Sequence, residues 1–173
     1  MASVCLLTGK PGTGKTTVIR QALAASKIKA GGFYTEEIRS GATRQGFRIV
    51  TLDGRGAVLS HIDNRGPHRV SKYGVDISNL NGVAVAAVEE AIEKSDLIVI
   101  DEIGKMELFS DRFRDAVLKA INAPGKVLGT IMLAPHPFAD EVKRRPHVRV
   151  TELTRSNRER VLQEIVDWIK SYP

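Results

Sequence analysis

Residues 9–16 constrain this chain more than any other stretch, because they fit the phosphate-loop pattern G-x-x-x-x-G-K-[ST] at every fixed position. An apolar run, residues 4–7, comes before them, and a helix-forming segment, residues 17–25, follows. Glycines allow the backbone to curl until several N–H groups converge on one anion, and the new helix adds its positive end. The stretch therefore predicts a strand, a phosphate-binding loop and a helix. The alternative is a glycine-rich turn with an exposed lysine.

A second signal lies where an apolar strand ends in two carboxylates, Asp101 and Glu102. In open α/β sheets, ligands gather at the carboxyl ends of the strands. We expect Lys15 to reach the β- and γ-phosphates, while Thr16 and Asp101 hold Mg²⁺. A carboxylate beside the metal-holding aspartate can deprotonate water, so Glu102 is the expected general base. Without the loop, solvated or helix-capping acids would explain the pair equally well.

The composition predicts a globular protein with one domain over residues 1–173. Hydrophobic residues make up 42% of the chain and charged residues 27%, which is enough for one full core. No apolar run approaches the roughly 18 residues of a membrane span, and no secretory leader precedes the first strand. Cys5 has no partner for an internal disulfide. We therefore expect a cytoplasmic protein with no membrane partner, and the sequence does not predict an oligomeric state.

Apolar periodicity and turn residues predict the order of the elements. The expected strands are 3–8, 33–39, 47–52, 58–62, 97–100, 127–133 and 148–152, and the expected helices are 15–26, 83–94, 112–121 and 138–144. A last helix is expected to begin with a capping box in which Ser156 is the N-cap and Glu159 reaches back. The short strands between 33 and 62 indicate an antiparallel insertion, and residues 63–82 are expected to be irregular.

Residues 101–108 and 32–39 resemble signature stretches of the small P-loop nucleoside-triphosphatases, a family that includes thermophile enzymes and the human cancer-related nucleoside-triphosphatase. Further matches fall in the same order at Gly46-Phe47, Val50-Thr51-Leu52, Gly129-Thr130-Ile131 and Thr154 with Asn157-Arg158. The resemblance covers nearly the whole chain. It implies an α/β fold with a RecA/AAA-like, mostly parallel sheet flanked by helices, and an antiparallel β-hairpin insertion.

The resemblance also implies slow, Mg²⁺-dependent hydrolysis of nucleoside triphosphates to diphosphate and phosphate, with a loose choice of base. The chain lacks the Asn-Lys-x-Asp motif that reads guanine, which agrees with a loose choice. Residues 33–39 are expected to border the nucleotide. The residues expected to contact it are Gly9, Lys10, Pro11, Gly12, Thr13, Gly14, Lys15, Thr16 and Thr17 of the loop, and Leu97, Ile98, Val99, Ile100, Asp101, Glu102, Ile103 and Gly104 of the acidic strand.

Several other residues are weaker candidates for the site. Arg158, in the family-like pair 157–158, is the first choice for a catalytic arginine that stabilises charge on the transferred phosphoryl group, with Arg112 and Arg144 as alternatives. A solvated arginine at the start of a helix is an equally good interpretation of Arg158. Lys105 could pair with the second carboxylate or touch a phosphate, and Thr130 could sense the γ-phosphate.

Two other functions stay open from the sequence. A kinase on the same fold would use one of the two carboxylates to activate an acceptor hydroxyl, but its one candidate for an arginine-rich lid is the short run 143–145. A nucleic-acid-linked ATPase would explain the net charge of +6 and the cations scattered from Arg44 to Lys72. Aromatic residues make up only 5% of the chain, which gives little support to a stacking platform for nucleic acid.

Overall fold

Five neighbouring parallel strands form more than half of the nine-stranded sheet, and their carboxyl ends meet along one side of it. The computed structural model describes residues 1–171. The five strands are, in spatial order, β2 (Ala30–Ser40), β7 (Leu97–Ile103), β8 (Lys126–Ile131), β1 (Ser3–Thr8) and β9 (Val148–Glu152). Because β8 alone separates β1 from β7, the phosphate loop and the acidic strand end lie close together.

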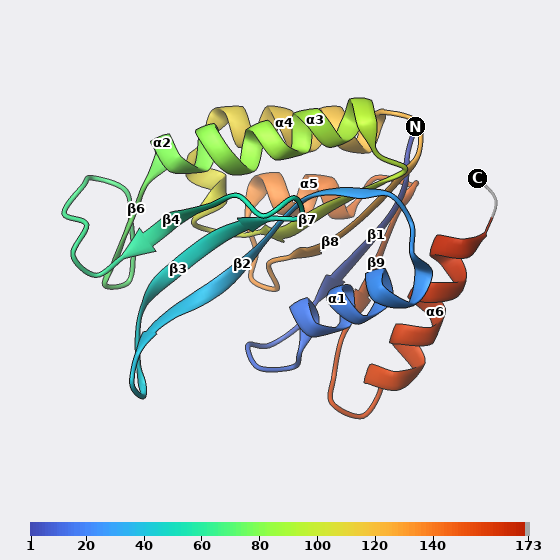
Figure 1. Cartoon of the computed structure of the whole chain (residues 1–173), viewed down its shortest axis with the longest axis horizontal. Coiled ribbons are helices and arrows are strands. Elements are labelled where there is room, and N and C mark those ends of the chain that lie inside the picture. Colours follow the sequence, from blue (N-terminus) through green and yellow to red (C-terminus); the bar gives the residue numbers. More distant parts are fainter. Residues whose placement is uncertain (172–173) are drawn as a thin grey trace.

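Helices cover both faces of these strands (Figure 1). The helices α3 (Ala86–Lys94), α4 (Asp111–Asn122) and α5 (Pro137–Lys143) pack on one face, and α1 (Lys15–Ser26) and α6 (Arg158–Lys170) pack on the other. Burial from both sides explains the continuous apolar runs of β1, β7 and β8. The expected helix-flanked, mostly parallel sheet is confirmed. None of the helices within residues 1–171 is long and apolar enough to cross a membrane.

An antiparallel extension continues the sheet beyond β2. Its strands are β3 (Thr43–Thr51), β4 (Gly56–His61), β5 (Arg69–Val70) and β6 (Tyr73–Val75). Only the first four residues of β2 pair with β7, whereas the rest of the strand pairs with β3 and runs past the end of β7. The expected β-hairpin is therefore confirmed, and it projects beyond the edge of the sheet at which the parallel strands end (Figure 1).

Residues 63–82 are more ordered than the sequence predicts. They contain β5, β6, the helical turn α2 (Ile77–Asn79) and the start of a π-helical segment (Leu80–Val85) that continues into α3. Tyr73 is buried, and its ring packs edge-on against Phe47, with ring centroids 5.7 Å apart. The expectation of an irregular segment was wrong, because pairing with β4 and burial against the hairpin hold these short strands.

The last helix begins differently from the prediction. Its N-cap residue is Asn157, not Ser156, and no side chain caps the helix. The Asn157 side-chain oxygen instead accepts a hydrogen bond from the backbone N–H of Thr154 at 2.7 Å. The predicted capping box with Glu159 was therefore wrong, because Asn157 stabilises the turn that enters the helix.

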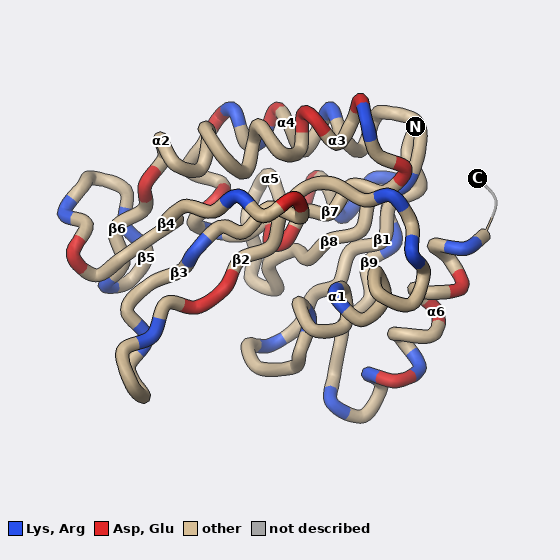
Figure 2. The backbone as a smooth tube through the Cα atoms, viewed as in Figure 1, with Lys and Arg blue, Asp and Glu red and all other residues tan. Residues whose placement is uncertain are grey.

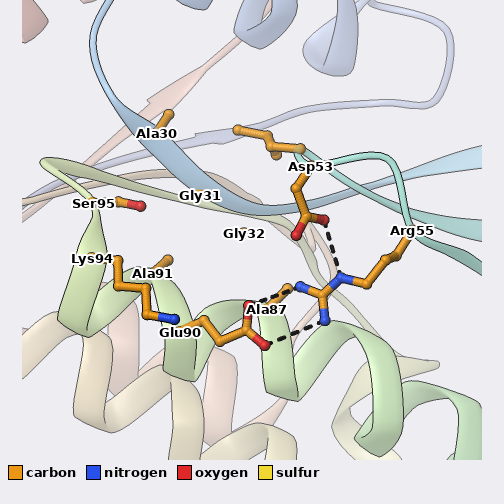
Figure 3. Close-up of a pocket in the computed structure, with 11 residues that line it drawn as sticks. Ala30, Gly31, Gly32, Asp53, Arg55, Ala87, Glu90, Ala91, Lys94 and Ser95 are labelled. Carbon is orange, nitrogen blue, oxygen red and sulfur yellow. Dashed lines mark hydrogen bonds and ion pairs between the residues drawn. The ribbon is translucent and has the colours of Figure 1, made fainter.

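Two glycines near the start of β2 let this strand approach its neighbours closely (Figure 3). A Cβ on Gly31 would overlap the Ser95 hydroxyl and the Ala91 side chain of α3. Gly32 has a φ of +110°, and a Cβ there would overlap the carbonyl oxygen of Val99 in β7. The pairing of β2 with β7 therefore requires glycine at position 32.

The hollow in Figure 3 lies between the start of β2 and α3, away from the carboxyl edge of the sheet. Arg55 crosses it and forms ion pairs with Asp53 at 3.1 Å and with Glu90 at 3.0 Å. Arg55 therefore links the β3–β4 turn to α3, and we assign this hollow a structural role.

Replacement of Gly32 by alanine is expected to lower the free energy of unfolding by about 2 kcal/mol or more, because the new Cβ adds a backbone clash to the strain of a positive φ. Urea denaturation measures the change. Gly54→Ala is the matched control, since Gly54 has a φ of +94° but no atom within 4 Å of an added Cβ. Equal losses in the two variants would contradict the close approach of β2 to β7.

Candidate active site

The phosphate loop joins β1 to α1 and already has an anion-binding shape. Gly12 and Gly14 have φ of +80° and +89°, values that an L side chain rarely adopts. The Lys15 ammonium folds back over the loop and donates hydrogen bonds to the carbonyl oxygens of Gly9 at 2.9 Å and Lys10 at 3.0 Å. The Lys15 ammonium thus lies against the loop, at the first turn of the twelve-residue helix α1, where an anion would bind.

Asp101, in β7, connects the first turn of α1 to β8. Its side chain is only 3% exposed and accepts hydrogen bonds from the Thr16 hydroxyl at 2.6 Å and the Thr130 hydroxyl at 2.7 Å. Burial raises the pKa of Asp101, and the two hydroxyls oppose this shift. Thr130, expected as a phosphate sensor, is placed by the structure against Asp101, so its direct effect is on the position of that carboxylate.

The oxygen atoms of Thr16 and Asp101 suit a hard divalent cation. Mg²⁺ is usually held by one or two protein oxygens, with phosphates and water completing its shell. Within residues 1–171, no cluster of three or more His, Cys, Asp or Glu side chains could hold a metal on its own. The donor set therefore fits a cation that binds together with a phosphate ligand.

Glu102 faces the same space as the loop. It lines a cleft of about 470 Å³ with Lys15 and Thr16, and no donor among the described residues forms a hydrogen bond to its carboxylate. Burial raises the pKa of Glu102, and the negative charge of Asp101 adds to the shift. A Cβ on Gly104 would overlap the Glu102 carboxylate, so glycine at 104 leaves room for it. The Glu102 oxygens are thus free to accept a proton from a small molecule in the cleft.

The overhanging β2–β3 hairpin forms the far wall of this cleft. It contributes Thr35, Glu36 and Glu37 from β2, and Arg44 and Phe47 from β3. Sequence reasoning expected residues 33–39 to border the site but gave no role to β3. Only the pairing of the two strands brings the β3 side chains to the cleft. Phe47 belongs to a family-like match in the sequence, whereas no local signal identified Arg44.

A second hollow, of about 380 Å³, lies on the other side of the loop. Lys10, Pro11, Gly12 and Thr13 form one side, and the link between β9 and α6, residues 152–155, forms the other. Sequence reasoning missed this link as a site element, apart from the match at Thr154. The loop is therefore flanked by two hollows, and Glu102 lines only the first of them.

Arg158 lies beside the loop, at the start of α6. Its guanidinium donates a hydrogen bond to the carbonyl oxygen of Thr13 at 2.9 Å, and a Cβ on Gly14 would overlap it. Arg144 instead lies at the end of α5, close to the amino end of β9, as does the candidate lid 143–145. Among residues 1–171, no ion pair joins Lys105 to Glu102.

Several expected nucleotide contacts lie inside the sheet. The following side chains are at most 3% exposed and line neither hollow: Leu97, Ile98, Val99, Ile100 and Ile103. They shape the strand that presents the two carboxylates. Thr17, at the third position of α1, is exposed.

Glu107 is a buried carboxylate that sequence reasoning did not single out. It is 4% exposed and shares a hollow of about 180 Å³ with Glu102. Burial raises the pKa of Glu107 well above its usual value, and the charge of Glu102 adds to the shift. The folded protein therefore holds a proton on Glu107 at pH values at which the unfolded chain has lost it.

This shift predicts a pH-dependent stability. Above about pH 4.3, where a glutamic acid of the unfolded chain ionises, the folded state binds the extra proton, so the free energy of unfolding falls as pH rises toward the raised pKa. Glu107→Gln cannot ionise and is expected to lose less stability over this range, as measured by urea denaturation at several pH values. Glu93→Gln, on the exposed face of α3, is the control and should follow the unmodified protein. Parallel curves for Glu107→Gln and the unmodified protein would contradict the shift.

Comparison with known proteins gives sequence relatives along nearly the whole chain. A family described as NTPase matches residues 4–166. Nucleoside-triphosphatase THEP1 of Thermotoga maritima is 44% identical over 165 residues, which cover 95% of this chain and 94% of that protein. The cancer-related nucleoside-triphosphatase of Homo sapiens is 40% identical over 187 residues, which cover 99% of this chain and 98% of that protein.

Solved structures agree with this assignment. The crystal structure of THEP1 from the hyperthermophile Aquifex aeolicus matches with a TM-score of 0.89 and 35% identity, over 97% of this chain and 99% of that one. The solution structure of a human cancer-related nucleoside triphosphatase matches with a TM-score of 0.83 and 39% identity, over 100% of both chains. The resemblance noted from the sequence is confirmed, and the chain belongs to this family of nucleoside-triphosphatases.

Proposed function

We propose that the protein hydrolyses nucleoside triphosphates to diphosphate and phosphate with Mg²⁺, and with a loose choice of base. One observation carries the proposal: Lys15, Thr16 and Glu102 line one cleft, and Thr16 is hydrogen-bonded to the buried Asp101. The reaction needs an ammonium that binds phosphate, oxygen atoms that hold Mg²⁺ and a carboxylate free to accept a proton. Lys15, the pair Thr16 and Asp101, and Glu102 would supply these groups.

The loop and Lys15 would bind the phosphates. Backbone N–H groups of residues 12–16 and the start of α1 attract the anion, and the Lys15 ammonium exchanges its two carbonyl partners for phosphate oxygens. Thr16 and Asp101 would hold Mg²⁺, which neutralises charge on the β- and γ-phosphate oxygens when it is bound. The Thr130 hydroxyl keeps the Asp101 carboxylate oriented toward Thr16.

Glu102 would act as the general base. Water attacks the γ-phosphorus, the bond to the β–γ bridging oxygen breaks, and the diphosphate leaves with the electron pair of that bond. Glu102 accepts the proton of the attacking water, a role for which its free oxygens and its place in the cleft both suit it. The γ-phosphate would therefore point toward β7.

The nucleoside would then lie on the opposite side of the loop, toward β9 and α6. The hollow there is shared by the loop and residues 152–155, and it has no guanine-reading motif. Arg158, bonded to Thr13 on this side, would act on the phosphates from the nucleoside end. The missing guanine-reading motif supports a loose choice of base.

A cytoplasmic location is part of the same proposal. Cys5 is buried in β1, and it is the single cysteine of the chain. A lone, buried thiol suits a reducing compartment. Cell fractionation measures the location, and recovery of the protein in the secreted or the membrane fraction would contradict the proposal.

Glu102→Gln is expected to retain nucleotide binding and to lose most turnover, by about 10²–10⁴-fold, because the amide cannot accept the proton. Phosphate release from ATP and GTP with Mg²⁺ and no acceptor measures turnover, and a fluorescent triphosphate analogue measures binding. Lys15→Ala is the contrasting variant and should weaken binding itself. Phosphate release by the unmodified protein at the rate seen without enzyme would overturn the proposed function. Full activity of Glu102→Gln would overturn the assignment of Glu102 as the general base.

Gly104→Ala is expected to fold normally but to lower turnover, because the new Cβ displaces the flexible end of Glu102 and not backbone. The expected loss is about 10-fold or more in kcat, since a misplaced base loses much of its effect. The circular dichroism spectrum and the denaturation midpoint should match those of the unmodified protein. Unchanged kcat in a folded Gly104→Ala variant would show that Glu102 need not occupy this position.

A further inference from the structure

Arg44 is placed by the hairpin in the cleft that holds the proposed chemistry. Among the described residues, it is the one arginine that lines this cleft together with Lys15, Thr16 and Glu102. Arg44 lies near the start of β3, and it lines the cleft because the hairpin projects past the end of β7. Figure 2 shows acidic residues on β2 and basic residues along β3, so the contacts that Arg44 makes distinguish it from the other basic residues of the hairpin.

Three neighbours hold the Arg44 guanidinium in place. Its Nε donates a hydrogen bond to the Tyr73 hydroxyl at 2.9 Å, and a terminal nitrogen donates to Glu37 at 3.3 Å. The guanidinium also lies over the rings of Phe47, at 4.9 Å, and Tyr73, at 5.4 Å. Stacking on aromatic faces leaves the edge of the guanidinium able to bind an anion.

The charge on this wall is not cancelled by its acidic partner. Glu37 is shared by two arginines, because Arg39 also donates to it, at 2.6 Å. Among these three side chains, one carboxylate between two guanidinium groups leaves one positive charge in excess. Glu36, on the same wall, is paired with Arg20 at 3.4 Å. The Arg44 side chain is 41% exposed, so an anion in the cleft can reach it. Lys15 and Arg44 therefore present positive charge from opposite walls of the same cleft.

We propose that Arg44 is a catalytic residue that donates hydrogen bonds to the γ-phosphoryl oxygens in the transition state. The proposal rests on the proposed function. During transfer, negative charge spreads over the three equatorial oxygens of the γ-phosphoryl group, and an arginine placed there stabilises it. Arg44 forms no covalent bond and transfers no proton, since Glu102 takes the proton of water and the diphosphate takes the electron pair.

The position of Arg44 separates it from Arg158. Arg158 bonds to Thr13 on the side of the loop that faces residues 152–155, whereas Arg44 shares its cleft with Glu102. If the γ-phosphate points toward Glu102, Arg44 lies on the same side of the loop as the γ-phosphate, and Arg158 lies on the side of the nucleoside. The antiparallel extension thus supplies the arginine within the same chain.

The test compares Arg44→Ala and Arg44→Lys with the control Arg39→Ala, which removes the other arginine bound to Glu37 but lies outside the cleft. Arg44→Ala is expected to lower kcat by about 10²–10³-fold with KM changed by less than about threefold, because the contact forms in the transition state. Arg44→Lys should recover only part of the rate, since an ammonium lacks the fork of donors. Arg39→Ala should stay near the unmodified rate.

Binding of two ligands provides a second readout. Arg44→Ala should bind Mg²⁺-ADP as the unmodified protein does, but bind Mg²⁺-ADP with aluminium fluoride, which mimics the transferred phosphoryl group, more weakly by a factor similar to the loss in kcat. Equal weakening of both ligands would overturn the proposal and make Arg44 a ground-state binding residue. Unmodified kcat in Arg44→Ala, or an equal loss in Arg39→Ala, would also overturn it.

Folding and the proposed function are checked separately. If Arg44→Ala unfolds, Arg44→Gln keeps the side-chain stem over Phe47 and replaces it in both measurements. Failure of the proposed function would appear as background phosphate release by the unmodified protein, and the role of Arg44 would fall with it. Failure of the inference alone would leave the unmodified protein active and Glu102→Gln inactive, with Arg44→Ala as active as the unmodified protein.

Discussion

The two hydrogen bonds that Asp101 accepts connect the parts of the site to one another. Thr16 belongs to the helix after β1, Asp101 to the end of β7, and Thr130 to the end of β8, which lies between them. A buried carboxylate needs such donors, because desolvation without them would favour its neutral form. The same bonds therefore satisfy the buried charge, hold the start of α1 against the acidic strand and fix the Asp101 oxygens beside the Thr16 hydroxyl, where we propose that the cation binds.

The antiparallel extension gives this common phosphate-binding core a second wall. Because β2 pairs with β7 over only four residues, the rest of the strand leaves the layer of helices and carries β3 with it. The β3 side chains then face the loop across the cleft. Tyr73, from β6, lines the same cleft and contacts Phe47 and Arg44, so the wall is built from three separate stretches of the chain.

Much of the fold and of the site could be predicted locally. The bounds of β1, α1 and β9 agree with the expected ranges, because continuous apolar runs, glycines and helix formers act within a few residues. The sequence likewise predicted that Asp101 and Glu102 lie at the carboxyl end of a buried strand. The ordered segment around Tyr73 was not, because strands of two or three residues depend on a partner that lies elsewhere in the chain.

The sequence by itself determined the order of the elements around the site and predicted a phosphate loop, an oxygen pair suited to a cation and a candidate base, since each prediction depends on residue types at short, fixed spacings. The tertiary structure decided which side of the loop each further residue occupies. Arg158 and Arg44 both lie outside the phosphate loop and the acidic strand, yet the tertiary structure puts one beside Thr13 and the other in the cleft with Glu102. Contacts between residues far apart in the sequence arise only when the sheet assembles, and they distinguish a phosphate-binding loop from a site for hydrolysis.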